Sequence, residues 1–223
     1  MTSFKIKHGE IGIQTHFLTP IFGLLDPPAS RVHSAFFGCL SKFGITTDDV
    51  KIGQGVPNLS EASLSYHLLN FNGMVKLSLD KMEVIFFDTT RLSKEQMTDV
   101  FDRVSTCLAK FAQDLAIREY SVNISLHGVL EGKSLVDFWR EFLPQVPQGL
   151  GPVTGQGVVF YYGRHDNTLG SSLVIDMSAR ISGGVYIKTS MNFDGTVVSA
   201  KTLPKITEDA FDLLTGNLGL TLE

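Results

Sequence analysis

The sequence predicts the same order of secondary-structure elements twice, in residues 1–116 and again in residues 117–223. Each half begins with an alternating strand and a helix, passes through a Gly-Gln-Gly turn, and continues with three strands and an amphipathic helix. Ile-Gln-Thr-His at 13–16 aligns with Ile-Ser-Leu-His at 124–127, 111 positions later. This internal duplication constrains the fold most, because whatever unit the first half forms is expected again in the second.

Four segments carry apolar residues at spacings of three and four, which is the period of an amphipathic helix. They cover residues 26–43, 94–115, 134–143 and 205–215. An Asp-Pro-Pro start at 26–28 and Gly44 as a left-handed end residue delimit the first helix. Ser93 and Gln96 form a capping box before the second, and Ser134 opens the third. These signals predict where helices interrupt the strands.

Between the helices the period changes to two. Apolar and polar residues alternate over 120–127, which predicts a strand with one buried and one wet face, as is usual in antiparallel sheets. Residues 64–88 predict three further strands, of which the first two are joined by a hairpin turn at Asn72-Gly73.

A second hairpin is expected around the three-residue turn at 182–184, Ser-Gly-Gly. That turn would pair Ile181 with Val185 and Ala179 with Ile187, which keeps the apolar side chains on one face of the sheet.

The order of elements predicts an α+β fold. Each half, 1–116 and 117–223, is a β-α-β-β-β-α unit whose helices can pack on one face of a largely antiparallel sheet. Two such units can join edge to edge into a single curved sheet, so the chain is either two similar domains or one continuous domain.

Composition excludes some classes of function. With 223 residues, 43% of them hydrophobic and 16 of them Phe, the chain can bury a substantial core. A net charge of −4 argues against bulk electrostatic binding to nucleic acid or to an anionic membrane, because both need a concentrated basic face. We therefore expect no nucleic-acid partner and no membrane partner.

The two cysteines, Cys39 and Cys107, fall inside expected helices on or beside the apolar stripe. This usage is typical of a reducing compartment. The first nine residues have no apolar stretch of signal-peptide length. We expect a soluble, cytoplasmic protein.

The segment 127–134, His-Gly-Val-Leu-Glu-Gly-Lys-Ser, comes nearest to a catalytic or cofactor-binding motif. It follows an expected strand and opens an expected helix, which is the setting of a phosphate-binding loop. In this alternative Gly128, Gly132, Lys133 and Ser134 would hold a nucleotide. The spacing differs by one residue, since the motif needs glycine where His127 stands. The other interpretation is a glycine-containing turn followed by a serine helix cap.

His16 and His127 stand at matching ends of the first strand of each half. A pseudo-twofold axis between the halves would bring the two imidazoles together, where they would bind a metal ion or share a proton. The sequence provides no third or fourth ligand at a recognised spacing, so a retained pair of surface histidines is the simpler interpretation. We expect no metal and no cofactor.

One group of residues favours a binding surface. Aromatic and charged side chains gather on the strands of the second half, a composition enriched at protein interfaces; the group is Tyr161, Asp176, Arg180, Tyr186 and Lys188. The alternative is a core that includes Phe160 and Tyr162 below an ordinary wet sheet face.

These observations favour a non-enzymatic, intracellular protein that binds a protein partner, or regulates one, through its sheet face or sheet edge. Open sheet edges also allow a homodimer. Two other classes stay open, a nucleotide-binding protein or enzyme that uses the loop 127–134, and a small-ligand binder with a cavity between sheet and helices.

Overall fold

The computed structural model describes residues 2–21, 30–53, 62–111, 115–142, 157–163, 168–196, 205, 207–208, 211 and 218–223. Its helices are α1 (Ser30–Leu40), α2 (Lys94–Phe111) and α3 (Leu135–Phe142). Its strands are β1 (Thr2–Phe17), β2 (Val50–Gly53), β3 (Ser63–Leu68), β4 (Gly73–Ser78), β5 (Lys81–Phe86), β6 (Ile117–Glu131), β7 (Val158–Tyr162), β8 (Thr168–Met177), β9 (Val185–Asp194) and β10 (Leu220–Leu222). The expected helix start at 26–28, the middle of both Gly-Gln-Gly turns and most of the expected helix 205–215 lie outside the described residues.

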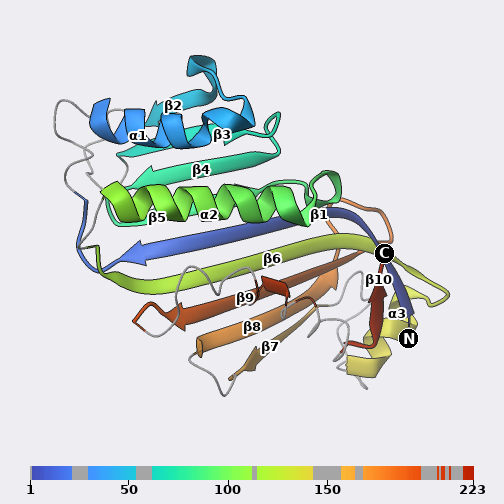
Figure 1. Ribbon diagram of the computed structural model, residues 1–223. Coiled ribbons are helices and arrows are strands. Elements are labelled where there is room, and N and C mark those ends of the chain that lie inside the picture. The colour runs from blue at the N-terminus through green and yellow to red at the C-terminus, as the bar shows by residue number, and fades with distance from the viewer. Residues whose placement is uncertain are drawn as a thin grey trace.

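In the described residues the ten strands form one sheet, in the order β2-β3-β4-β5-β1-β6-β9-β8-β7 (Figure 1). All neighbours along this path are antiparallel, and β10 adds to β1 in parallel. The long strands β1 and β6 form the centre, and β5 to β2 extend from one side as β9 to β7 extend from the other. The expected α+β class is confirmed, and the two parts of the sheet meet edge to edge at the β1–β6 pair.

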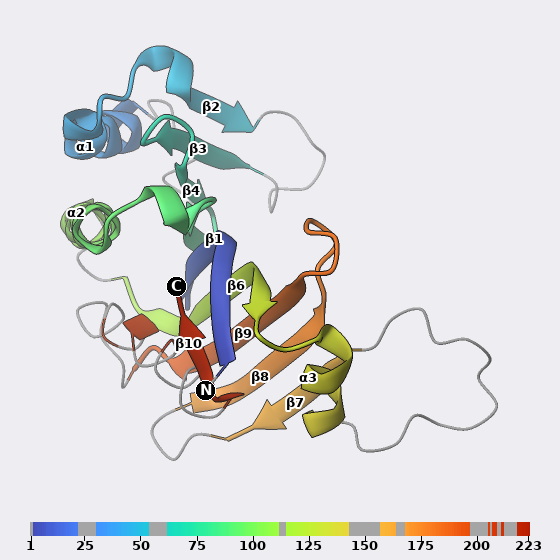
Figure 2. The same ribbon diagram turned by 90° about the vertical axis from the view of Figure 1, so that its right-hand side faces the viewer.

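Helices α1 and α2 lie side by side over the β2–β5 side of the sheet (Figures 1 and 2). They contribute Val32, Phe36 and Leu40, and Val100, Phe101, Val104 and Leu108, to the core. Helix α3 lies apart from this layer, at the end of the sheet where both chain ends are found (Figure 1). Its Phe138 and Trp139 are buried.

The helix signals in the sequence act as expected. Ser93 N–H donates to Gln96 Oε1 at 2.9 Å, and Gln96 N–H donates to Ser93 Oγ at 3.2 Å, which is the predicted capping box. Gly44 has φ +74°, the left-handed conformation predicted for it. The described part of the second helix ends at Phe111, within the predicted range of 94–115.

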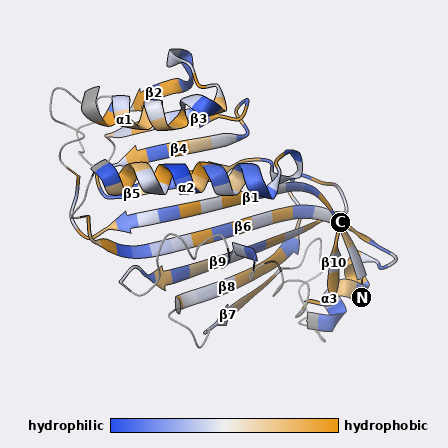
Figure 3. Cartoon of the chain, in the orientation of Figure 1, coloured by the Kyte–Doolittle hydropathy of each residue, from blue (hydrophilic) through white to orange (hydrophobic). Residues whose placement is uncertain are grey.

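The predicted alternation along β6 is confirmed. Tyr120, Val122, Ile124 and Leu126 are all buried in the core. They pair across the sheet with Phe193, Met191, Thr189 and Ile187 of β9, which point to the same face. The alternation appears in Figure 3 as successive bands of opposite hydropathy along the strands.

The predicted hairpin between the first two strands of residues 64–88 is confirmed, but its turn is not at Asn72-Gly73. Gly73 begins β4 and pairs with Leu68, so the turn is formed by residues 69–72. Leu69 and the two residues after it have positive φ, and Asn72 N–H closes the turn on the Leu69 carbonyl at 3.1 Å. A Cβ on Gly73 would stand 3.0 Å from Leu68 Cδ1, so this glycine provides space rather than turn geometry.

The predicted register of the second hairpin is also wrong. Val185 pairs with Met177 rather than Ile181, and Ile187 pairs with Ile175 rather than Ala179. The reason is a longer connection over 178–184, which is closed by Ser178 N–H on the Gly184 carbonyl at 2.9 Å. Because the shift is even, Ile187 still points to the core.

Candidate functional site

Polar side chains line the face of the sheet opposite to the core. On β1, β6 and β9 they are His8, Glu10, Gln14, Ser121, Asn123, Ser125, His127, Tyr186, Lys188, Ser190 and Asn192. Neighbours on this face bind one another, as where Ser190 Oγ donates to Asn123 Oδ1 at 2.7 Å and Gln14 Nε2 donates to Glu83 Oε1 at 2.7 Å. We call this the polar face.

The structure places His16 and His127 at opposite ends of the β1–β6 ladder, which corrects the expectation that they meet. In this antiparallel ladder His16 pairs with Glu119 near one end, while His127 lies toward the other end. His127 pairs instead with His8, and the centroids of their rings are 6.0 Å apart. His8 was not selected from the sequence, because its pairing with His127 depends on the register of β1 against β6.

His127 is held in one protonation state by its partners. Its Nδ1 lies 2.8 Å from Ser178 Oγ, which already accepts the backbone N–H groups of Arg180 at 3.1 Å and Ile181 at 2.9 Å. The serine hydroxyl therefore donates its hydrogen to the imidazole, which must accept it as a neutral ring. Burial lowers the pKa of His127, and the nearby Arg180 and His8 lower it further.

His8 lies between His127 and the charged side chain of Asp88. The Arg180 guanidinium donates to His8 Nε2, so the ring proton of neutral His8 lies on Nδ1, 3.8 Å from Asp88 Oδ1. Asp88 also pairs with Arg91, whose Nε is 3.0 Å from Oδ2. Asp88 and Ser178, like His8, were not among the candidate site residues selected from the sequence.

Tyr186 completes the cluster. Its ring centroid lies 4.7 Å from that of His127, and its hydroxyl is 3.4 Å from Ser125 Oγ. Tyr186 pairs across the strands with Asp176, and Lys188 pairs with Ser125 and Val174. Of the predicted binding residues, the structure thus brings His127, Arg180 and Tyr186 together and places Asp176 and Lys188 beside them. We call His8, Asp88, His127, Ser178, Arg180 and Tyr186 the histidine cluster.

The other end of the ladder has different chemistry. His16 pairs with Glu119 on one side and Lys81 on the other. Burial lowers the pKa of His16, and the Glu119 carboxylate acts in the opposite direction.

Tyr161 lies away from the histidine cluster, on β7 at the end of the strand order. Within the described part of the chain no strand pairs with the outer side of β7. Val159, Phe160 and Tyr161 are 51%, 39% and 85% exposed, and Leu169 near the start of β8 is exposed as well. The alternative interpretation placed Phe160 and Tyr162 in the core. Phe160 is exposed because it stands on the outermost strand, whereas Tyr162 is half-buried and its hydroxyl lies 3.1 Å from Thr189 Oγ1.

The edge strand is accompanied by a hollow of about 520 Å³, which contains Tyr161, Leu169, Ser172 and Asn192 among its lining residues. Backbone groups at the edge of a sheet, exposed aromatic side chains and serine and asparagine side chains are the groups that bind an extended peptide. We call β7 with Leu169 the edge patch.

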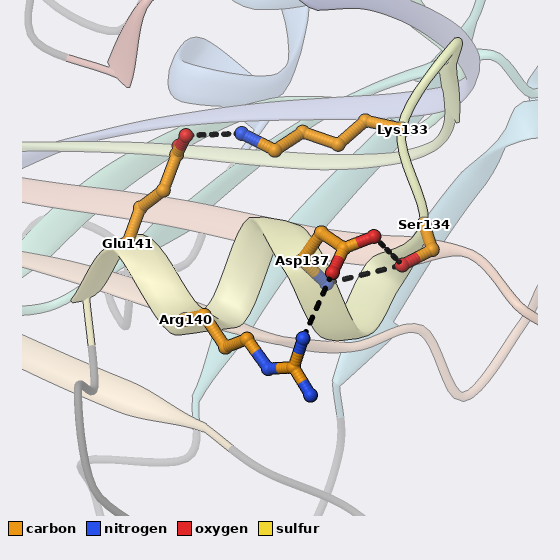
Figure 4. Close-up of polar contacts among 5 residues, drawn as sticks. All are labelled: Lys133, Ser134, Asp137, Arg140 and Glu141. Atoms are coloured by element: carbon orange, nitrogen blue, oxygen red, sulfur yellow. Dashed lines mark hydrogen bonds and ion pairs between the residues drawn. The ribbon is translucent and has the colours of Figure 1, made fainter.

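The segment 127–134 has the geometry of a helix cap. Ser134 Oγ accepts the Asp137 N–H at 3.1 Å and donates to Asp137 Oδ2 at 2.6 Å, and Lys133 pairs with Glu141 (Figure 4). Gly128 lies within β6, where a Cβ would stand 2.5 Å from the Lys5 carbonyl oxygen. Gly132 has φ +78° and makes the turn into α3. Nucleotide binding here stays a prediction, and it would require Lys133 to leave Glu141.

A cavity of about 240 Å³ lies between α2, the sheet and Thr207, Glu208 and Phe211 of the C-terminal segment. Its apolar lining residues are Ile11, Ile13, Phe86, Met97, Phe101 and Phe211. The ion pair of Lys94 Nζ and Glu208 Oε1, 2.6 Å apart, also borders it. The cavity is the kind of space that the small-ligand alternative requires.

Among the residues that the structure describes, no group of three His, Cys, Asp or Glu side chains is placed to hold a metal ion. Of the described helices, none combines the length and the apolar character that a membrane crossing requires. No protein-family model matches the chain, and no curated protein matches its sequence. Its function is therefore inferred from the geometry of its own surfaces.

Proposed function

We propose that the chain is an intracellular, non-enzymatic interaction module that binds a protein partner through the edge patch. The observation that carries this proposal is the exposure of Val159, Phe160 and Tyr161 on an edge strand that contains no charged residue. Edge strands without charge or proline are the ones that accept another strand. An extended segment of the partner adds to β7 through backbone hydrogen bonds, and the hollow beside Tyr161 receives one of its side chains.

The opposite edge of the sheet provides a contrast within the same molecule. Strand β2 has four residues and includes Lys51, and Ile52 is its exposed apolar residue. A lysine on an edge strand disfavours the addition of another strand. This difference favours β7 over β2 as the binding edge.

The test compares a lysine on each edge. Val159→Lys places a charge on β7, and Ile52→Lys, at a similarly exposed position, places the same charge on β2. Tagged variants are expressed in the source cells, and bound proteins are quantified by mass spectrometry. We expect Val159→Lys to reduce recovery of the partner at least about tenfold, equivalent to about 1.4 kcal/mol, and Ile52→Lys to leave recovery unchanged.

Hydrogen exchange on the purified complex locates the contact. New protection of the β7 amides supports strand addition, whereas equal loss of the partner in both variants, or no protection at β7, contradicts it. If the captured protein is a second copy of this chain, the wild type elutes as a dimer in size-exclusion chromatography and Val159→Lys as a monomer.

The second candidate function is binding of a small apolar ligand in the cavity below α2. Its apolar lining favours this function, and its volume of about 240 Å³ limits the ligand to a small one. Native mass spectrometry of protein purified without denaturant should then find a bound metabolite. Phe101→Trp, which extends a lining side chain into the space, should remove that ligand while the edge patch still binds its partner.

Nucleotide binding at 127–134 is tested by thermal shift with nucleotides and magnesium. Stabilisation of the wild type that Lys133→Ala abolishes would support it. Equal responses of the two proteins would exclude Lys133 from binding.

We also propose that the halves 1–116 and 117–223 are copies of one unit. The order of strands outward from the centre supports this, because β1 is followed by β5, β4 and β3 as β6 is followed by β9, β8 and β7. In this proposal the edge patch has its counterpart in β3, and β2 is an addition to the first copy that covers it.

A further inference from the structure

Cys39 and Cys107 lie on neighbouring helices, away from the edge patch and the histidine cluster. Cys39 is half-buried on α1, and Cys107 is buried on α2. Both border a groove of about 800 Å³, whose rim also includes Asp99, Arg103 and Lys110. The groove gives small solutes a route to the two sulfur atoms.

The contacts of Cys39 bring the two thiols together. Cys39 Sγ donates to the backbone carbonyl of Arg103 at 3.0 Å. Arg103 stands one helical turn before Cys107, and the Cα–Cβ bond of a helical residue tilts toward the helix N-terminus. The Cys107 side chain is therefore directed to the turn that Cys39 contacts, and the Cys39 sulfur lies close enough to contribute to the raised pKa of the Cys107 thiol.

We propose that Cys39 and Cys107 are a peroxide-sensitive pair that forms a disulfide bond between α1 and α2 within one chain. In the reduced protein both thiols border the same groove, and the Cys39 sulfur contacts the helical turn of α2 that precedes Cys107, so the pair is placed to reach disulfide geometry. The modification site is independent of partner binding at β7.

The two thiols take different roles in the reaction. Burial raises the pKa of the Cys107 thiol to about 12, and the adjacent Cys39 sulfur contributes to the shift, so Cys107 stays protonated. Cys39 is the more accessible of the two and reacts first. The Cys39 thiolate attacks one oxygen of hydrogen peroxide, the O–O bond breaks, and a sulfenic acid and hydroxide result.

The second step closes the bridge. The Cys107 sulfur attacks Cys39 Sγ, the S–O bond breaks, and the sulfenic hydroxyl leaves as water with the proton of the Cys107 thiol. The hydroxide of the first step takes up the proton that Cys39 lost. In total, one peroxide molecule is reduced to two water molecules while two thiols are oxidised to one disulfide.

The experiment treats the purified, reduced full chain with hydrogen peroxide and maps its peptides without reducing agent. We expect the peptides of Cys39 and Cys107 to be recovered as one linked species, with the intact chain lighter by two hydrogen atoms. A thiol reductant should restore the starting mass. The oxidised chain should also melt at a higher temperature than the reduced chain, because the bridge restricts the unfolded state.

Serine variants separate the roles of the two residues. In Cys107→Ser a sulfenic acid should persist on Cys39 and react with dimedone. In Cys39→Ser the loss of the Cys107 thiol should slow at least about tenfold, because the buried thiol has lost the partner that reacts first.

The wild-type peptide map tests the disulfide between Cys39 and Cys107 even if a variant fails to fold. Oxygen adducts on Cys39 beside a free Cys107 thiol would overturn the proposal. Two unreacted thiols, or a bridge between two chains, would overturn it as well.

Discussion

The two sides of the sheet differ in how they end. On one side, β3, β4 and β5 bury their apolar face below α1 and α2, and the outermost strand β2 is short and carries Lys51. On the other side, burial is complete at Ile187 and Ile175 and then falls at β7, where Tyr161 is exposed. The first side therefore ends in a short strand that carries a lysine, whereas the second side ends in a strand with exposed apolar side chains, which is the surface that the proposed function uses.

The largest predicted difference in stability comes from removing one phenylalanine side chain on each side of the sheet. Phe36 of α1 is fully buried and stacks on Tyr66, with ring centroids 6.0 Å apart. Phe36→Ala should lower the free energy of unfolding by about 3–5 kcal/mol in urea titration, because it leaves a cavity between helix and sheet. Phe160→Ala on β7 should cost less than about 1 kcal/mol, because that side chain is already partly in water. Equal losses would mean that β7 is as much a part of the core as α1.

A smaller loss of stability is expected from a substitution on the polar face of the first side. Glu83 is buried there and accepts hydrogen bonds from Gln14 at 2.7 Å and from Lys81 at 3.1 Å. Glu83→Ala leaves the Gln14 amide without this partner and should cost about 1–3 kcal/mol, measured by the same titration. Asp176→Ala on the second side is the control, since Asp176 is exposed and its loss should leave stability nearly unchanged.

His127 gives the second side a pH-dependent contribution. Because burial lowers its pKa below the ordinary value of 6.5, the unfolded chain takes up a proton more readily than the folded chain. This contribution is fully present above about pH 6.5 and is lost as the pH falls below it toward the folded pKa. Unfolding free energies measured from about pH 8 down to about pH 5 should therefore decrease.

His127→Phe keeps a ring beside Tyr186 but removes the acceptor of the Ser178 hydroxyl. It should cost about 1 kcal/mol at neutral pH. It should also flatten the pH dependence, leaving the part that belongs to His16, whose pKa burial lowers as well. An unchanged slope would show that His127 titrates alike in the folded and unfolded chain.

The smallest effect on stability is expected at Tyr161. Tyr161→Ser should change the free energy of unfolding by less than about 0.5 kcal/mol, because the side chain is almost wholly in solvent. The same variant should weaken partner recovery in the affinity experiment. A marked loss of stability would show that the edge patch supports the fold and would weaken its assignment as a binding surface.

The helices and the strand faces could be predicted from the sequence because their signals are local. The apolar stripe of α2, its Ser93–Gln96 box and the alternation along β6 each depend on a few residues of one segment. The α+β class followed from the order of these segments, whereas one continuous sheet was only one of two arrangements that this order left open.

Registers were less predictable because they depend on turns and on distant partners. The turn of residues 69–72 places Leu69, Asn70 and Phe71 at positive φ, where sequence preference would choose glycine. Strand β10 has three residues and is defined by its pairing with the start of β1, from Thr2↔Leu220 onward. The meeting of His8 with His127 follows from the β1–β6 register, which no local pattern contains.

The central β1–β6 pair also has a consequence for the speed and order of folding. It joins residues far apart in the chain, as in Ile11↔Ile124, whereas β3, β4 and β5 are connected by short turns. Bringing β1 and β6 together closes a long loop of chain, which costs entropy before any contact compensates for it. Folding rates therefore fall when pairings between distant residues dominate a structure. We expect the β3–β5 meander to form early and the β1–β6 ladder to form late, so that β7 to β9 have no template until most of the chain has been synthesised.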